Sequence, residues 1–208
     1  IMHFVFVKYP FGEFFIPTAT LRPETIFGVT NLWANPAVTY LKAAVDGEKW
    51  IISREAAEKL RLQKHTVTEI VTISGAELVD KAATHPITGA AVPILPASFV
   101  DPDMGSGLVM SVPAHAPFDY IALRDLQQQG KYIEIVPIPL VTVPNFGKIP
   151  AQEIVEKNKI PHQDDPRIDE LTQELYTAEF SKGQLNENCG EHAGTSVRQA
   201  REDVTREV

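Results

Sequence analysis

Residues 105–120 read GSGLVMSVPAHAPFDY, a stretch that predicts a turn, a strand and the start of a helix in succession. The two glycines predict a tight turn, and the apolar run at 108–112 that follows them predicts a strand. Proline ends that strand because it cannot donate to a ladder. Pro117 then suits a first helical position, so we expect Asp119 in the first turn of a helix that runs to Gln129.

The predicted position of Asp119 at a helix N-terminus has a chemical consequence. The positive end of the helix dipole stabilises the ionised carboxylate, so we expect its pKa to be lowered. Such a group is a poor general base near neutral pH but a durable anion that can bind an ammonium group. Taken alone, the stretch favours a structural interpretation, because an acid in a first turn commonly interacts only with the helix dipole.

A second motif lies near the start of the chain, where residues 18–25 read TATLRPET. Its three threonines supply hydroxyl groups around a proline that forces Arg22 into an extended conformation. Thr25 can open the turn that follows. Threonines beside a proline are also ordinary loop material, and the motif by itself leaves both interpretations open.

The composition describes a globular chain with one substantial core. It has 208 residues, 44% of them hydrophobic, and no long apolar run. The opening Ile1–Val7 lacks the features of a secretion signal, and we interpret it as a first strand and as a cut inside a longer protein. One cysteine, Cys189, excludes an intramolecular disulfide and a thiolate metal cluster, which fits a reducing cytoplasm.

The net charge of −8 argues against a stand-alone nucleic-acid binder, because phosphate contacts supply non-specific affinity. The sequence contains neither a phosphate-binding P-loop nor a dinucleotide-binding fingerprint. A serine hydrolase built on Ser106 or Ser111 with His115 is disfavoured, since the sequence has no Gly-x-Ser-x-Gly elbow. A zinc site from His115 and Asp119 is disfavoured as well, because it lacks a helical His-Glu-x-x-His or a cysteine pair.

The coarse pattern predicts short strands up to about residue 143 and helices after it. Residues 39–52 predict a hairpin closed by Asp46-Gly47, and Ser53 is expected to cap a helix over 54–62. Many short strands favour a barrel or a strongly bent sheet. Further strands are expected at 67–73, 91–95, 108–112 and 133–143, and helices at 150–159, 166–180 and 195–208. We therefore expect two parts, a core at 1–145 and a mainly helical extension at 146–208 packed on the same domain.

Both motifs, in this order, resemble the amino-acid editing domain inserted in leucyl-tRNA synthetases, with wording nearest to the archaeal and eukaryotic branch. The resemblance covers residues 14–125 well, including NLWANP at 31–36 and VPILPA at 92–97. It implies an α+β fold: a β-barrel-like editing domain of the valyl, leucyl and isoleucyl type, with peripheral helices and a helical C-terminal appendage. It also implies hydrolysis of mischarged aminoacyl-tRNA, after transfer to the tRNA and possibly before it.

The resemblance assigns roles to residues. It implies that Asp119 binds the α-amino group of the substrate and that Thr20 bonds the substrate or its attacking water, which makes these two the catalytic residues. Thr25 would face the amino-acid side chain. Leucine and isoleucine have equal atom counts, so a β-branched Thr25 would read where the side chain branches. Further substrate-binding residues would be Leu21, Arg22, Met110, Ser111, Val112 and His115, with oxyanion-stabilising backbone donors near 110–112.

Partners and alternatives follow from the same resemblance. The expected partners are the 3′ end of aminoacylated leucine tRNA and the remainder of the synthetase, with no membrane and a cytoplasmic location. The resemblance implies that editing needs no metal or cofactor and that ATP and magnesium belong only to the synthetic core, whose signatures this chain lacks. Two alternatives stay open: a valine-type editing domain acting on threonyl-tRNA, and a non-catalytic module that only docks the tRNA end or a partner protein.

Overall fold

The computed structural model describes residues 4–207, so Ile1 to His3 of the predicted first strand lie outside the described residues. Two compact units divide the chain. Unit 1 comprises the chain up to Leu21 and Asn31–Met110, and unit 2 comprises Arg22–Thr30 and Ser111–Glu207. The limits of these units differ from the boundary predicted at 145/146. That boundary stays a prediction. Between residues 4 and 207, no helix has the length and apolar content needed to cross a membrane.

Unit 1 is built on a five-stranded sheet with the order β1-β2-β5-β4-β6. All of its pairs are antiparallel except β2 with β5, which run parallel and pair at Phe15 and Trp50. A second sheet has the order β7-β8-β3-β9. The strands of the first sheet are β1 (Val5–Phe11), β2 (Phe14–Thr20), β4 (Thr39–Val45), β5 (Glu48–Ser53) and β6 (Val67–Ser74). Those of the second are β3 (Asn31–Ala34), β7 (Ala82–Thr84), β8 (Ala91–Pro96) and β9 (Val109–Ser111).

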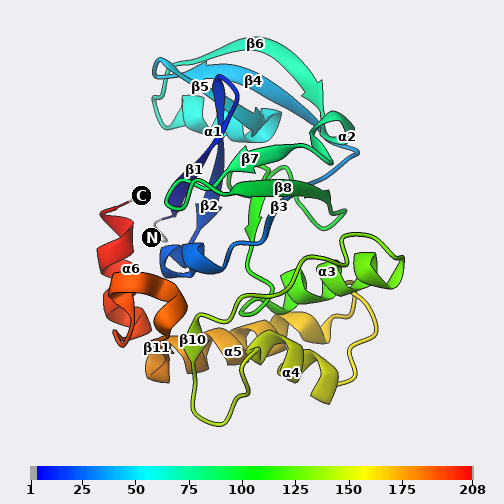
Figure 1. Cartoon of the computed structure of the whole chain (residues 1–208). Helices are drawn as coiled ribbons and strands as arrows, with labels where there is room; N and C mark the ends of the chain where they lie inside the picture. Colours follow the sequence, from blue (N-terminus) through cyan, green and yellow to red (C-terminus); the bar gives the residue numbers. More distant parts are fainter. Residues whose placement is uncertain (1–3, 208) are drawn as a thin grey trace. The chain divides into compact units, whose positions relative to one another are not determined.

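The hairpin and the helix start predicted for unit 1 are confirmed. Asp46 and Gly47 join β4 to β5 with φ angles of 47° and 92°, which a two-residue hairpin turn requires. Ser53 accepts a hydrogen bond from the backbone N–H of Ala56 at 3.0 Å and so caps α1 (Arg54–Leu62). Figure 1 shows α1 beside β4 and β5, where its apolar face packs on the sheet; the short α2 (Gly75–Leu78) follows β6.

The prediction of a barrel is wrong, although the α+β class is confirmed. Closure requires that edge strands pair with each other, whereas the described residues form open sheets whose orders end at β1 and β6 and at β7 and β9. Two features of the sequence suit these edges. Pro10 within β1 has no N–H to donate, and most of β6 is exposed.

Unit 2 contains the helices predicted in its part of the chain, and three of them, α3, α4 and α5, share one apolar core. Figure 1 shows α3 in green and α4 to α6 in yellow to red. Tyr120, Ile154 and Leu171 are core residues of α3, α4 and α5 respectively. The elements are η1 (Pro23–Gly28), α3 (Pro117–Gln128), β10 (Val141–Thr142), α4 (Pro150–Lys157), α5 (Arg167–Lys182), β11 (Gln184–Leu185), η2 (Glu187–His192) and α6 (Val197–Thr205).

The strand predicted at 133–143 is largely wrong, because only Val141–Thr142 forms one, in β10. The segment reads IEIVPIPLVTV, and its two prolines remove donors that a ladder needs. The backbone N–H groups of Leu140 and Val141 donate instead to the imidazole of His115. The imidazole of His115, from a loop 25 residues away, therefore accepts the hydrogen bonds that the sequence pattern had assigned to a neighbouring strand.

Candidate functional site

The Arg-Pro-Glu-Thr loop, residues 22–25, lies in unit 2, where Arg22 precedes η1 and Pro23 begins it. Pro23 occupies the first turn, as its fixed φ favours. Both the backbone N–H and the hydroxyl of Thr25 donate to the carbonyl oxygen of Arg22, at 3.0 and 2.8 Å. Thr25 is buried, and its hydroxyl hydrogen is used within its own turn. The orientation of the side chain is therefore set by the loop itself.

Asp119 lies in the first turn of α3, as the sequence predicts. Pro117 begins the helix, and one carboxylate oxygen of Asp119 accepts a hydrogen bond from the backbone N–H of Val112 at 2.8 Å. The side chain is 6% exposed. This bond ties the entrance of the helix to the end of the preceding strand, and it engages one of the backbone donors that we expected near an oxyanion.

The guanidinium group of Arg22 connects the two motifs. Its Nη2 lies 2.6 Å from Oε2 of Glu179, its Nε donates to Glu24 at 3.1 Å, and it stacks over the ring of Tyr176 at 4.5 Å. Its Nη1 reaches the carbonyl oxygen of His115 in a long hydrogen bond of 3.5 Å. The Arg-Pro-Glu-Thr loop and the Pro-Ala-His loop, residues 113–116, therefore meet at one cation whose side chain is 16% exposed.

Both ring nitrogens of His115 form hydrogen bonds with other residues of the chain. Its Nε2 accepts hydrogen bonds from the N–H groups of Leu140, at 2.8 Å, and Val141, at 3.3 Å. Because a backbone N–H can only donate, the proton of the neutral ring lies on Nδ1, which donates to Oε1 of Glu179 at 2.6 Å. The side chain is 1% exposed. His115 thus holds three segments of unit 2 together.

The guanidinium group of Arg22 lies beside two buried carboxylates, and the pKa values of these two groups shift in opposite directions. Burial by itself raises the pKa of the Glu179 carboxyl, but the charge of Arg22 and the hydrogen bond from His115 outweigh burial, and the net pKa is lowered. Burial also raises the pKa of Glu24, and there Arg22 does not compensate for it. Glu179 is therefore the principal counter-ion of Arg22 in this cluster.

The remaining site residues of the sequence analysis lie in several places. Thr20 ends β2 in unit 1, opposite Val5, and Leu21 follows it. Met110 is also in unit 1, where its sulfur accepts a hydrogen bond from Tyr9. The Ser111 hydroxyl of unit 2 is buried and has no hydrogen-bond partner among the described residues. The roles proposed for these residues stay predictions.

Glu179, the buried carboxylate that contacts both loops, was not among the residues predicted from the sequence. A signal was present, because Ile168, Leu171 and Leu175 form an apolar stripe, and Glu179 continues it one helical turn further. A charge on the buried face of a helix requires a partner. The identity of that partner could not be read from the sequence, since Arg22 is far away along the chain.

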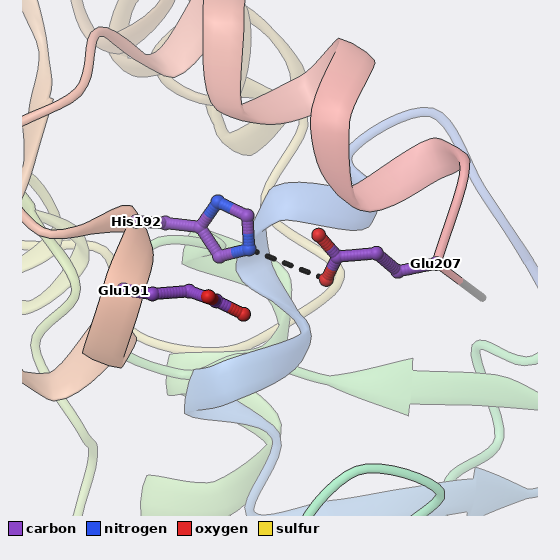
Figure 2. A group of neighbouring side chains, drawn as sticks. All are labelled: Glu191, His192 and Glu207. Atoms are coloured by element: carbon purple, nitrogen blue, oxygen red, sulfur yellow. Dashed lines mark hydrogen bonds and ion pairs between the residues drawn. The ribbon is translucent and has the colours of Figure 1, made fainter.

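A separate group in unit 2 approaches the geometry of a cation site. The ligand atoms of Glu191, His192 and Glu207 lie within 4.8 Å of one another. Figure 2 shows the imidazole of His192 pointing toward Glu207, and Nε2 and Oε2 are 3.3 Å apart. Both glutamates are exposed, and the ring of His192 also contacts Phe27. We interpret the contact between His192 and Glu207 as a hydrogen bond that holds the end of α6 near η2.

Comparison with known proteins agrees with this geometry. The profile of the family described as "Leucyl-tRNA synthetase, editing domain" matches residues 13–136. The leucine–tRNA ligase of Methanocaldococcus jannaschii is 48% identical over 93% of this chain, and that of Methanothrix thermoacetophila is 44% identical over its whole length. The chain therefore belongs to the leucyl-tRNA synthetase editing domain family, with relatives of the archaeal type. It spans only 22% and 23% of those two ligases.

Solved structures show the same fold. The P. knowlesi cytosolic leucyl-tRNA synthetase editing domain superposes with a TM-score of 0.85 at 17% sequence identity, covering 98% of this chain and 91% of that one. At this identity the similarity concerns the fold alone. It agrees with the α+β class.

Proposed function

We propose that this chain is the editing segment of a longer leucine–tRNA ligase and that it hydrolyses leucine tRNA charged with isoleucine, valine or another non-leucine amino acid. The observation that carries the proposal is the meeting of two loops in unit 2: Arg22 joins the loop that holds Thr25 to the loop that leads into Asp119. The family match supports leucine over the valine-type alternative. The buried, free Cys189 agrees with a cytoplasmic location.

The chemistry proposed is ester hydrolysis. The Asp119 carboxylate binds the α-ammonium group of the aminoacyl ester and so orients its carbonyl carbon. Water adds to that carbon, the bond to the ribose oxygen breaks, and this oxygen takes up a proton that comes from the attacking water, which leaves a free ribose hydroxyl and the free amino acid. Thr20 would hold the water or the substrate, and a neighbouring ribose hydroxyl would assist. The substrate-binding roles of Leu21, Met110 and Ser111 belong to the same proposal.

Thr25 is proposed to select the substrate by shape. Its hydroxyl donates to Arg22, so the rotamer is held by a short hydrogen bond and by its β-branch. A fixed side chain can obstruct the γ-branch of leucine while it tolerates isoleucine or valine. The correctly charged tRNA then escapes hydrolysis.

Replacing Asp119 tests the hydrolytic function. In the full-length ligase, Asp119→Asn is expected to lower kcat/KM for deacylation of isoleucyl-tRNA by about 100-fold, because a charge-assisted bond contributes about 3 kcal/mol. The amide oxygen can still accept from Val112, so the loop geometry is retained. Asp125→Asn, on the same helix, is the matched control and should stay within twofold. Equal rates for Asp119→Asn and wild type would contradict the proposal, and a wild type without hydrolysis would favour a non-catalytic docking module.

Replacing Thr25 tests the selection. Thr25→Ala removes the branch and is expected to make the full-length ligase deacylate leucyl-tRNA at least 10-fold faster than wild type, because the obstruction to the γ-branch is gone. Hydrolysis of isoleucyl-tRNA should change little. The measurement is release of labelled leucine from leucyl-tRNA. Thr30→Ala, beyond the end of η1, is the control. Unchanged discrimination in Thr25→Ala would exclude this residue as the sieve.

A further inference from the structure

Glu179, on the helical tail, contacts both motif loops with the two oxygens of one carboxylate. Oε2 lies 2.6 Å from Nη2 of Arg22, and Oε1 lies 2.6 Å from Nδ1 of His115. The side chain is fully buried. We propose that Glu179 is a positioning residue for the hydrolysis proposed above, on which this inference rests. It fixes the Arg-Pro-Glu-Thr loop against the Pro-Ala-His loop.

The contacts lead from Glu179 to the reacting groups on both sides. On one side, the carbonyl oxygen of Arg22 accepts from the hydroxyl of Thr25, so the position of Arg22 sets that of Thr25. On the other, the backbone N–H of His115 donates to the carbonyl of Val112, whose own N–H binds Asp119. A shift of the carboxylate therefore displaces the side-chain sieve and the ammonium-binding group together.

The tail suits this role because α5 is a rigid support. Ile168, Leu171 and Leu175 anchor it in the apolar core of unit 2, which also contains Ile121 of α3. Helices α3 and α5 are in contact. Asp119 and Glu179 are therefore both carried by helices that pack in the same core, and sites built on helices are held more accurately than sites on loops.

The ion pair with Arg22 and the hydrogen bond from His115 together require a carboxylate. The guanidinium of Arg22 presents a cation to Oε2, and His115 donates through Nδ1 to Oε1, so Glu179 must offer an oxygen to each partner. A glutamine offers one acceptor oxygen and one donor NH2. If its oxygen keeps Arg22, its NH2 faces His115, which must then move its proton to Nε2 and lose the N–H donors of Leu140 and Val141.

The experiment compares Glu179→Gln with wild type in the full-length ligase. The expected result is a fall in kcat for isoleucyl-tRNA deacylation of about 10- to 100-fold, since misplacement by about 1 Å can cost that much. KM should change less than threefold, because other parts of the ligase hold the tRNA. Glu174→Gln, an exposed glutamate of the same helix, is the matched control and should leave kcat unchanged. Glu179→Asp keeps the charge but is too short to reach both partners, so it should also lose activity.

A second readout separates positioning from general stability. The ¹⁵N chemical shifts of the histidine ring should show His115 with its proton on Nδ1 in wild type and in Glu174→Gln, and a different proton position in Glu179→Gln. Wild-type kcat in a folded Glu179→Gln, or an unchanged ring, would overturn the inference while leaving the proposed function intact. An inactive wild type would overturn the proposed function, and the ring shifts would then decide alone whether Glu179 joins the two loops.

Discussion

Arg22→Ala is expected to lower the free energy of unfolding of the 208-residue chain by about 3–5 kcal/mol at pH 7. The change removes the guanidinium that contacts both Glu24 and Glu179, which are 1% and 0% exposed, and so takes the ion-pair partner from two buried carboxylates. It also removes the stack on Tyr176. Urea denaturation followed by circular dichroism measures the loss.

The loss of stability in Arg22→Ala should also depend on pH, and its direction can be derived. Arg22 is the main cause that lowers the pKa of Glu179, so without it burial raises the pKa of both carboxyls. A folded state with raised carboxyl pKa values gains stability as pH falls, since it binds protons more readily than the unfolded chain. The deficit of Arg22→Ala should therefore shrink between pH 7 and pH 5.

The control for Arg22→Ala is Arg54→Ala. Arg54 is half exposed and lies 3.7 Å from Glu69, and an exposed pair of this kind contributes less than about 1 kcal/mol. A loss below about 1 kcal/mol for Arg22→Ala at pH 7, or a deficit that grows as the pH falls, would show that Arg22 does not neutralise this cluster.

Trp33→Ala is expected to cost about 3–5 kcal/mol, because it deletes a large buried side chain from the core of unit 1. Trp33 lies on β3 with no exposed surface, and its ring packs edge to face on Phe99 at 5.8 Å. The surrounding sheet can collapse only in part around the cavity. Thermal unfolding followed by circular dichroism checks the value without depending on tryptophan fluorescence.

The second tryptophan provides a matched comparison. Trp50 is partly exposed and donates from its indole N–H to Glu48, so Trp50→Ala should cost about 1 kcal/mol. Trp33→Phe keeps most of the apolar volume and should fall between the two. Equal losses for Trp33→Ala and Trp50→Ala would contradict the burial argument.

The elements that sequence predicted correctly are those set by neighbouring residues. Asp46-Gly47 specifies its turn through backbone conformation, Ser53 caps the helix beside it, and Pro117 places Asp119 in a first turn. The strand prediction at 133–143 is largely wrong because Pro137 and Pro139 lack N–H donors, and because the N–H groups of Leu140 and Val141 bind His115, far away in sequence. The barrel failed because closure depends on which edges pair, and short-range pattern does not determine that.

The features of the candidate site also fall into those set by local sequence and those set by the tertiary fold. The two motifs and the helix-entrance position of Asp119 could be read from the chain, since each is a local pattern. The bond from Val112 to Asp119 and the clasp of Arg22 by Glu179 depend on the tertiary fold. The sequence of the tail predicted an amphipathic helix. It did not indicate which loops the buried carboxylate of Glu179 would contact.

The open edge of the five-stranded sheet affects how the chain behaves at high concentration. Ile70 and Val71 of β6 are each 52% exposed, and no strand of the described residues covers the outer side of β6. Such an edge is a template for pairing with another copy. Glu69, paired with Arg61, places a charge within it, and the net charge of −8 keeps copies apart. Salt screens that repulsion, so colloidal stability should be greatest in dilute buffer.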